Sequence, residues 1–125
     1  METEKYDFGT LTVGDHFIVG EMKEGTDIQL DVVSKLIDIA YERFNGERWA
    51  YISNRVNSYS LQPLVHFELS KVENNMIAFA VVTDKELHIK NAELEKSYAG
   101  GRYEFECFAN IENAIAWVTK LLKVG

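Results

Sequence analysis

Residues 76–82 read MIAFAVV, and this run decides how the rest of the chain is interpreted. Every position is apolar, which is typical of a strand whose two faces are both buried, whereas a half-buried strand alternates apolar and polar residues. The run is far too short to cross a bilayer as a helix. It predicts a central strand of a sheet that carries helices on both faces.

Further strands are predicted on either side of this run. The segment RWAYISN (residues 48–54) is rich in the aromatic and β-branched residues that favour strands. RYEFECF (residues 102–108) alternates, with Tyr103, Phe105 and Cys107 on one face, and predicts a strand near a sheet edge. KYDFGTL (residues 5–11) and HFIVGEM (residues 16–22) predict two strands around a turn at Gly14–Asp15.

Two helices are predicted between these strands. The first spans about Asp27 to Phe44, with capping-box spacing at Thr26 and Gln29 and a left-handed stop at Asn45. The second is short and follows residue 60, with Pro63 in its first turn. Its inward residues are expected to be Leu61, Leu64, Val65, Leu69 and Val72.

Two more helices are predicted in the C-terminal half. KELHIKNAELEKSY (residues 85–98) follows capping-box spacing at Thr83 and Glu86, with an interruption expected near Asn91. The apolar residues of this helix that are expected to face the protein core are Leu87, Leu94 and Tyr98. Asn110 is expected to cap the last helix. The inward residues of that helix are expected to be Ile111, Ala114, Ile115, Val118 and Leu122.

This order of elements indicates an α/β fold and a single domain spanning residues 1–125. The sheet is expected to be mixed and mostly parallel, with about five strands, an N-terminal β-hairpin and about four helices.

Composition and charge argue against several functional classes. The chain has 13 basic and 20 acidic residues, a formal charge of −7, and dispersed cations, which disfavours nucleic acid as a partner. A single cysteine and a charged N-terminus without an export signal predict a cytoplasmic protein, with no integral membrane segment. His16, His66 and His88 fall on separate elements without metal-ligand spacing, and no nucleophile elbow or phosphate loop occurs. We therefore expect no enzyme, no metal and no cofactor.

The candidate site lies at the carboxyl ends of the parallel strands, because ligands of open α/β sheets favour the crevice beyond these strand ends. One loop supplies Asn54, Arg55, Ser58, Tyr59 and Ser60, and its neighbour supplies Thr83, Asp84 and Lys85. Helix starts favour anions, so a small ligand with apolar and anionic parts fits this edge. The alternative interpretation is that these Ser, Asn and Thr side chains only cap helices and hold turns.

Two stretches resemble a known family. FANIENAIAWV (residues 108–118) and the strand-to-helix run AFAVVTDK (residues 78–85) resemble the packing motifs of SpoIIAA-like proteins, in the wider group of STAS and SEC14-type domains. The resemblance implies a binding module without catalytic residues. Among anti-sigma-factor antagonists of this group a serine at the start of the second helix is phosphorylated, which points to Ser58 or Ser60 here. Among SEC14-type members the sheet and helices enclose an apolar ligand.

Three functional hypotheses follow. The first is a non-enzymatic module that recognises a protein partner or a small, partly apolar ligand around residues 54–60 and 83–85. The alternatives are a phosphoswitch at Ser58 or Ser60 and a carrier of lipid or another hydrophobic ligand. The strand at 102–108 or the first hairpin also offers an edge for a homodimer.

Overall fold

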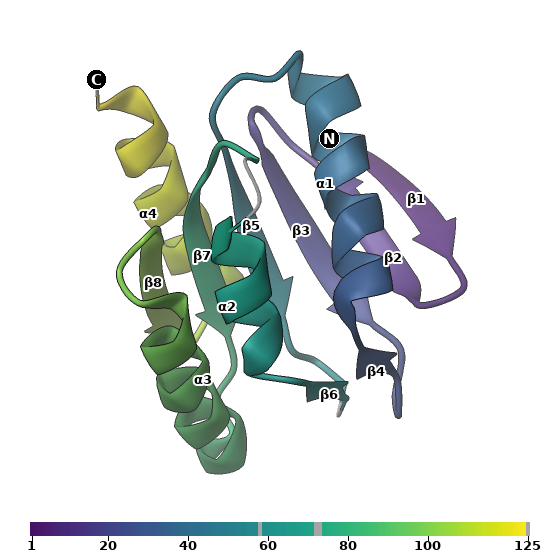
Figure 1. The fold of residues 1–125 in the computed structure, drawn as a ribbon, viewed down its shortest axis with the longest axis vertical. Helices are drawn as coiled ribbons and strands as arrows, with labels where there is room; N and C mark the ends of the chain where they lie inside the picture. Colours follow the sequence, from purple (N-terminus) through teal and green to yellow (C-terminus); the bar gives the residue numbers. More distant parts are fainter. Residues whose placement is uncertain (58, 72–73, 125) are drawn as a thin grey trace.

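A computed structural model of the chain describes residues 1–57, 59–71 and 74–124 (Figure 1). The elements follow in the order β1 (Glu2–Tyr6), β2 (Gly9–Val13), β3 (Phe17–Met22), β4 (Asp27–Ile28), α1 (Leu30–Phe44), β5 (Trp49–Asn54), β6 (Ser60–Leu61), α2 (Leu64–Lys71), β7 (Met76–Val82), α3 (Glu86–Ala99), β8 (Glu104–Phe108) and α4 (Ile111–Lys123).

The main sheet is mixed, as the sequence predicts. Its strand order is β1-β2-β3-β5-β7-β8. β2 runs antiparallel to its neighbours β1 and β3, while β3, β5, β7 and β8 are parallel. The expected count of about five strands is low: within the described residues this sheet has six strands, and β4 and β6 form a separate pair. The α/β class, the N-terminal hairpin and the four helices are confirmed for the described part of the chain.

Helices cover both faces of the sheet. Residues of α1, α2 and α3 pack on one face, while Ala114 and Val118 of α4 pack on the other (Figure 1). The central strand β7 serves both layers, because successive side chains of a strand point to opposite faces. Phe79 and Val81 join the first layer, and the small Ala80 joins the layer under α4.

The N-terminal segment forms three strands rather than the expected two. The predicted turn at Gly14 does separate β2 from β3, and the Gly14 amide donates to the Phe17 carbonyl at 2.8 Å. An additional tight turn precedes β2, because Tyr6 pairs directly with Gly9. Asp7 and Phe8 therefore form a two-residue hairpin loop that the sequence analysis missed.

Both predicted capping boxes are wrong. Asp27 and Ile28 are extended and pair with β6, so α1 begins at Leu30 and its N-cap Gln29 makes no side-chain cap bond. Before α3, the Thr83 hydroxyl accepts a hydrogen bond from the Lys85 amide at 3.2 Å instead of capping the helix. In the first case strand pairing and burial of Ile28 outweigh the local helix signal.

Two other predicted helix boundaries are confirmed. Asn45 ends α1 in the left-handed conformation with φ 54°. The Asn110 side chain accepts the Asn113 amide at 2.9 Å and so caps α4. α2 begins at Leu64, directly after Pro63; its residues Val65 and Leu69 are buried. The expected inward residue Leu64 is exposed, Leu61 lies in β6, and Val72 is outside the described residues.

The inward face of α3 was predicted wrongly. Leu87, Leu94 and Tyr98 are 67%, 51% and 42% exposed, and the helix runs through Asn91 without a break. The buried residues of α3 are His88, Ala92, Glu95 and Ala99. The two alanines leave room for close packing, and the two polar side chains find hydrogen-bond partners inside the domain.

Candidate functional site

A buried ion pair lies beneath the site predicted at the carboxyl ends of the strands. Arg55 follows β5 directly, and its backbone amide donates to the Val82 carbonyl at 2.9 Å, which fixes it beside the end of β7. Its two terminal nitrogens donate to the two carboxylate oxygens of Glu95 in α3, at 2.6 and 2.7 Å. Arg55 is 7% exposed and Glu95 1% exposed, so each charge depends on the other for compensation.

Two more side chains extend this pair into a network. His66 of α2 contacts Glu95 through Nε2 at 2.8 Å, and its Nδ1 contacts the Tyr103 hydroxyl at 2.6 Å. Because the Glu95 carboxylate accepts, we assign the imidazole proton to Nε2, with the Tyr103 hydroxyl donating to Nδ1. Both ring nitrogens of His66 thus have a hydrogen-bond partner. We define Arg55, Glu95, His66 and Tyr103 as the buried network; it joins the end of β5 to α2, α3 and the start of β8.

The pKa of the Glu95 carboxyl reflects this arrangement. Burial by itself raises that pKa, but hydrogen bonds from Arg55 and His66 outweigh burial and hold it below its ordinary value. Burial raises the pKa of the Tyr103 hydroxyl above its ordinary value. The network therefore contains an ionised Arg–Glu pair and a neutral tyrosine at pH 7.

Tyr59 lies against the same ion pair. Its hydroxyl is 2.6 Å from the Ser53 hydroxyl, which also accepts a hydrogen bond from Arg55 Nε at 3.1 Å. The Arg55 guanidinium carbon is 5.8 Å from the centre of the Tyr59 ring, within the range of a cation–π contact. Tyr59 is held in place by these contacts.

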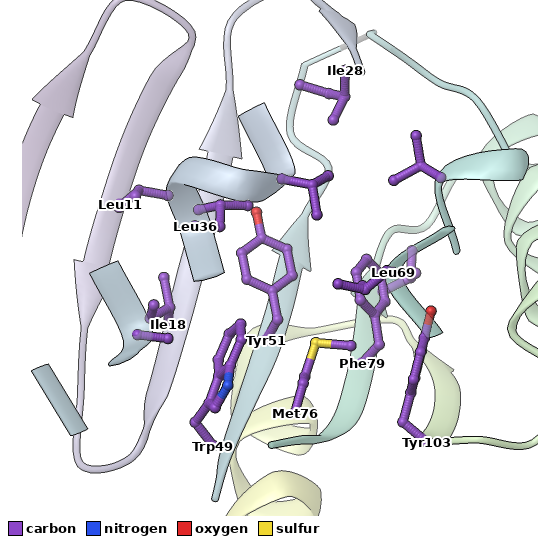
Figure 2. Packing of buried hydrophobic residues seen from close by; sticks show 14 of the residues in the cluster. Leu11, Ile18, Ile28, Leu36, Trp49, Tyr51, Leu69, Met76, Phe79 and Tyr103 are labelled. Atoms are coloured by element: carbon purple, nitrogen blue, oxygen red, sulfur yellow. The ribbon is translucent and has the colours of Figure 1, made fainter. Parts of the chain in front are cut away.

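An apolar cavity of about 40 Å³ lies between α1, α2 and the sheet. α1 contributes Leu36 and Ile37, α2 contributes Val65 and Leu69, and the sheet contributes Tyr51, Phe79 and others. Figure 2 shows Leu36, Tyr51, Leu69, Met76 and Phe79 converging on this region of the core. Ser53 and His66 also line the cavity, but both are engaged in the hydrogen bonds described above.

The cavity is unsuited to water. A water molecule needs roughly 10–15 Å³ of such space and two to four polar partners. The volume suffices, but the lining is almost entirely carbon. Apolar cavities of this kind stay dry and accept apolar molecules.

A second, surface hollow adjoins the cavity. It has a volume of about 260 Å³, and we call it the polar cleft. Its lining residues are Arg55, Asn57, Tyr59, Leu61, Pro63, His88, Asn91, Leu94 and Glu95. Tyr59 and Leu61 line both the polar cleft and the apolar cavity, so these two side chains form the wall between them.

His88 is a neutral group of the polar cleft. Its Nδ1 is 3.1 Å from the Thr83 hydroxyl, and its side chain is buried. Burial lowers the pKa of His88, and the nearby Lys85 and Arg55 lower it further. The imidazole is therefore uncharged at pH 7.

The structure brings some of the predicted site residues together. Arg55 and Tyr59 line the polar cleft. Thr83 contacts the cleft residue His88 through its hydroxyl. Asn54 is half-buried at the end of β5, whereas Asp84 and Lys85 are exposed. Ser58 lies outside the described residues, and Ser60 is described only through its backbone pairing with Asp27.

Several residues of this site were missed. Sequence reasoning did not identify the site residues that contact Arg55 and Thr83 directly or through the buried network, which are Ser53, His66, His88, Glu95 and Tyr103. One signal was present: residues 88, 92, 95 and 99 have the spacing of a single helix face. The large apolar residues of α3 lie on another face, and they misdirected the assignment.

Among residues 1–57, 59–71 and 74–124, no group of three His, Cys, Asp or Glu side chains is arranged to hold a metal ion. No helix within those same ranges has the length and apolar character needed to cross a membrane.

No family model matches the chain, and no curated protein matches its sequence. The resemblance to SpoIIAA-like domains therefore stays a prediction. A fold alone does not identify a function, which depends on the residues of the site.

Proposed function

We propose that the chain is a non-enzymatic binding module for a small, partly apolar molecule, held between α1, α2 and the sheet. The observation that carries this proposal is the carbon-lined cavity of about 40 Å³, which shares the lining residues Tyr59 and Leu61 with the polar cleft. Ligand sites in proteins are typically apolar hollows with a few convergent polar groups. The two adjoining hollows have this combination.

The state of the ionisable groups supports binding rather than catalysis. Arg55, Glu95 and His66 satisfy one another's hydrogen bonds inside the domain. A general acid or base must be able to reach a substrate atom, directly or through one water. Glu95 and His66, each 1% exposed, serve better as a rigid support for the cleft.

The size of the cavity limits what enters without rearrangement. At about 40 Å³ it admits only a small apolar group. Benzene or a longer hydrocarbon chain exceeds this volume and requires wall residues such as Tyr59 and Leu61 to move aside, which joins the cavity to the polar cleft. Carriage of an apolar ligand, an alternative drawn from the sequence, is compatible with this opening.

Nuclear magnetic resonance titration of the whole chain with benzene tests the proposal. We expect shifts concentrated at cavity residues such as Leu36, Val65 and Leu69. The variant Val33→Ile adds a methyl group at the cavity wall and is expected to weaken benzene binding. Val19→Ile is the matched control, because Val19 is buried on the face covered by α4. Absence of saturable shifts, or equal binding by both variants, would contradict the proposal.

A further inference from the structure

The charges that line the polar cleft cancel. Within the described residues, its charged lining groups are Arg55 and Glu95, which form the bidentate buried pair. Both oxygens of the Glu95 carboxylate already accept from Arg55, and one of them also contacts His66. A carboxylate or phosphate bound here would compete with Glu95 for Arg55 and leave a buried charge without its partner.

The cleft also offers uncharged hydrogen-bonding groups. His88 is neutral, and with its Nδ1 engaged by Thr83, its Nε2 is the ring nitrogen that can serve a ligand. Asn91 is exposed on α3 one turn further along the helix, since residues three and four apart are neighbours on a helix surface. Asn57 donates from its amide nitrogen to the Met22 carbonyl at 3.0 Å, which leaves its amide oxygen as an acceptor.

Apolar residues connect these groups to the interior. Leu61, Pro63 and Leu94 line the cleft beside them, and Leu61 continues into the cavity wall with Tyr59. Displacing Tyr59 costs its hydrogen bond with Ser53 and its contact with Arg55. A typical hydrogen bond contributes little net free energy, so burial of a few methylene groups of the ligand offsets the loss of these contacts.

We propose that the ligand is amphipathic, with an uncharged head group, a hydroxyl or an amide, bound at His88 and Asn91, and a hydrocarbon part that passes Tyr59 and Leu61 into the apolar cavity. This inference rests on the proposed function, and it adds the chemical class of the head group and the route of entry. The two hollows thus act as one site with a polar and an apolar end.

The experiment compares 1-octanol, octanoate and benzene as probes of the whole chain at pH 7, followed by resonance shifts. We expect octanol to shift cavity residues together with His88 and Asn91 of the polar cleft, and benzene to shift cavity residues and the shared wall but not His88 or Asn91. Octanol is expected to bind at least about tenfold more tightly than octanoate, since one uncompensated buried charge costs more than one neutral hydrogen bond.

Variants in the cleft test the head-group contacts. Asn91→Ala, at an exposed helix position, is expected to weaken octanol binding by about two- to tenfold and to leave benzene binding unchanged. Asn113→Ala on α4 is the matched control. His88→Gln keeps a neutral hydrogen-bonding side chain and is expected to retain the preference for octanol over octanoate.

The outcomes separate the two proposals. If benzene binds but octanoate binds as tightly as octanol, or Asn91→Ala changes nothing, the head-group inference is wrong and the proposed function stands. If neither benzene nor octanol binds, both are wrong. Asn91 lies on the surface, so its variant is informative even if the His88 variant fails to fold.

Discussion

Arg55 and Glu95 are 40 residues apart in the sequence, and their side chains form a bidentate ion pair inside the domain. The pair joins the end of β5 to the middle of α3. Since both groups are nearly inaccessible to solvent, loss of either one leaves the other charge buried without compensation. This relationship is the basis of the first two predictions.

Glu95→Leu is expected to lower the free energy of unfolding by about 3–5 kcal/mol, because it leaves the Arg55 guanidinium buried without a counter-charge. The double variant Arg55→Met/Glu95→Leu is expected to lose less than the sum of the two single variants, since it leaves no unpaired ion. Urea denaturation followed by circular dichroism measures all of these. Glu93→Gln, at an exposed site on the same helix, is the control. Additive losses across the cycle would show that the pair is not coupled.

The stability of the domain is expected to fall in acid through Glu95. The pKa of this carboxyl lies below its ordinary value of 4.5 in the folded chain. Its contribution is therefore fully present above the unfolded pKa and is lost as the pH falls through the folded pKa. The difference in unfolding free energy between the natural chain and Glu95→Gln should shrink below about pH 4.5. A difference that is constant with pH would contradict this assignment.

His16 gives a pH dependence of the opposite sign. Its ring nitrogens lie 2.9 Å from Glu47 and 3.0 Å from Asp15. The hydrogen bond to Glu47 raises the pKa of His16 above its ordinary 6.5, with burial opposing and Asp15 adding to the increase. The contribution is present below the unfolded pKa and is lost as the pH rises through the folded pKa.

The variant His16→Asn tests this contact, because asparagine tolerates the positive φ of 65° at this position. Denaturant titrations at pH 5.5 and pH 9 are expected to show a loss at the lower pH only. The side chain is 39% exposed, so the loss should remain below about 1 kcal/mol and shrink in high salt. An equal loss at both pH values would assign the effect to packing instead.

Gly20 controls the position of Tyr51 at the cavity wall. A Cβ at Gly20 would overlap the Tyr51 hydroxyl oxygen, so Gly20→Ala must displace that side chain. We expect a loss of about 1–3 kcal/mol, as for other overpacked cores, together with altered benzene binding. In the Tyr51→Phe background the penalty of Gly20→Ala should be smaller, because the closest atom is gone. An unchanged penalty would mean that Tyr51 is not the group that conflicts.

The layers of the fold were predictable because they follow from patterns that tertiary contacts do not override. MIAFAVV fixed the central strand, and Asn45 and Asn110 marked helix ends through their own local geometry. The first capping box failed because β4 pairs with β6, a strand more than 30 residues away that a local pattern does not reveal. The second failed locally, because the Thr83 hydroxyl accepts from the Lys85 amide and contacts His88 rather than capping α3.

The candidate site was predictable only in part. Arg55 and Tyr59 were identified because they follow a strand end, where parallel sheets bind ligands. Glu95, in contrast, is one of many glutamates in the sequence, and its burial depends on Arg55 and on His66. Polar side chains on the inward face of a helix become interpretable only when their partners from other elements are known.

The buried network also bears on how the domain opens. His66 lies in α2, Glu95 in α3, and Tyr103 just before β8, and His66 is hydrogen-bonded to both of the others. If either helix detached alone, the buried polar side chain of the other helix would lose a hydrogen-bond partner inside the protein. α2 and α3 should consequently open together as one cooperative unit, with similar amide hydrogen-exchange protection, while α4 on the opposite face opens independently.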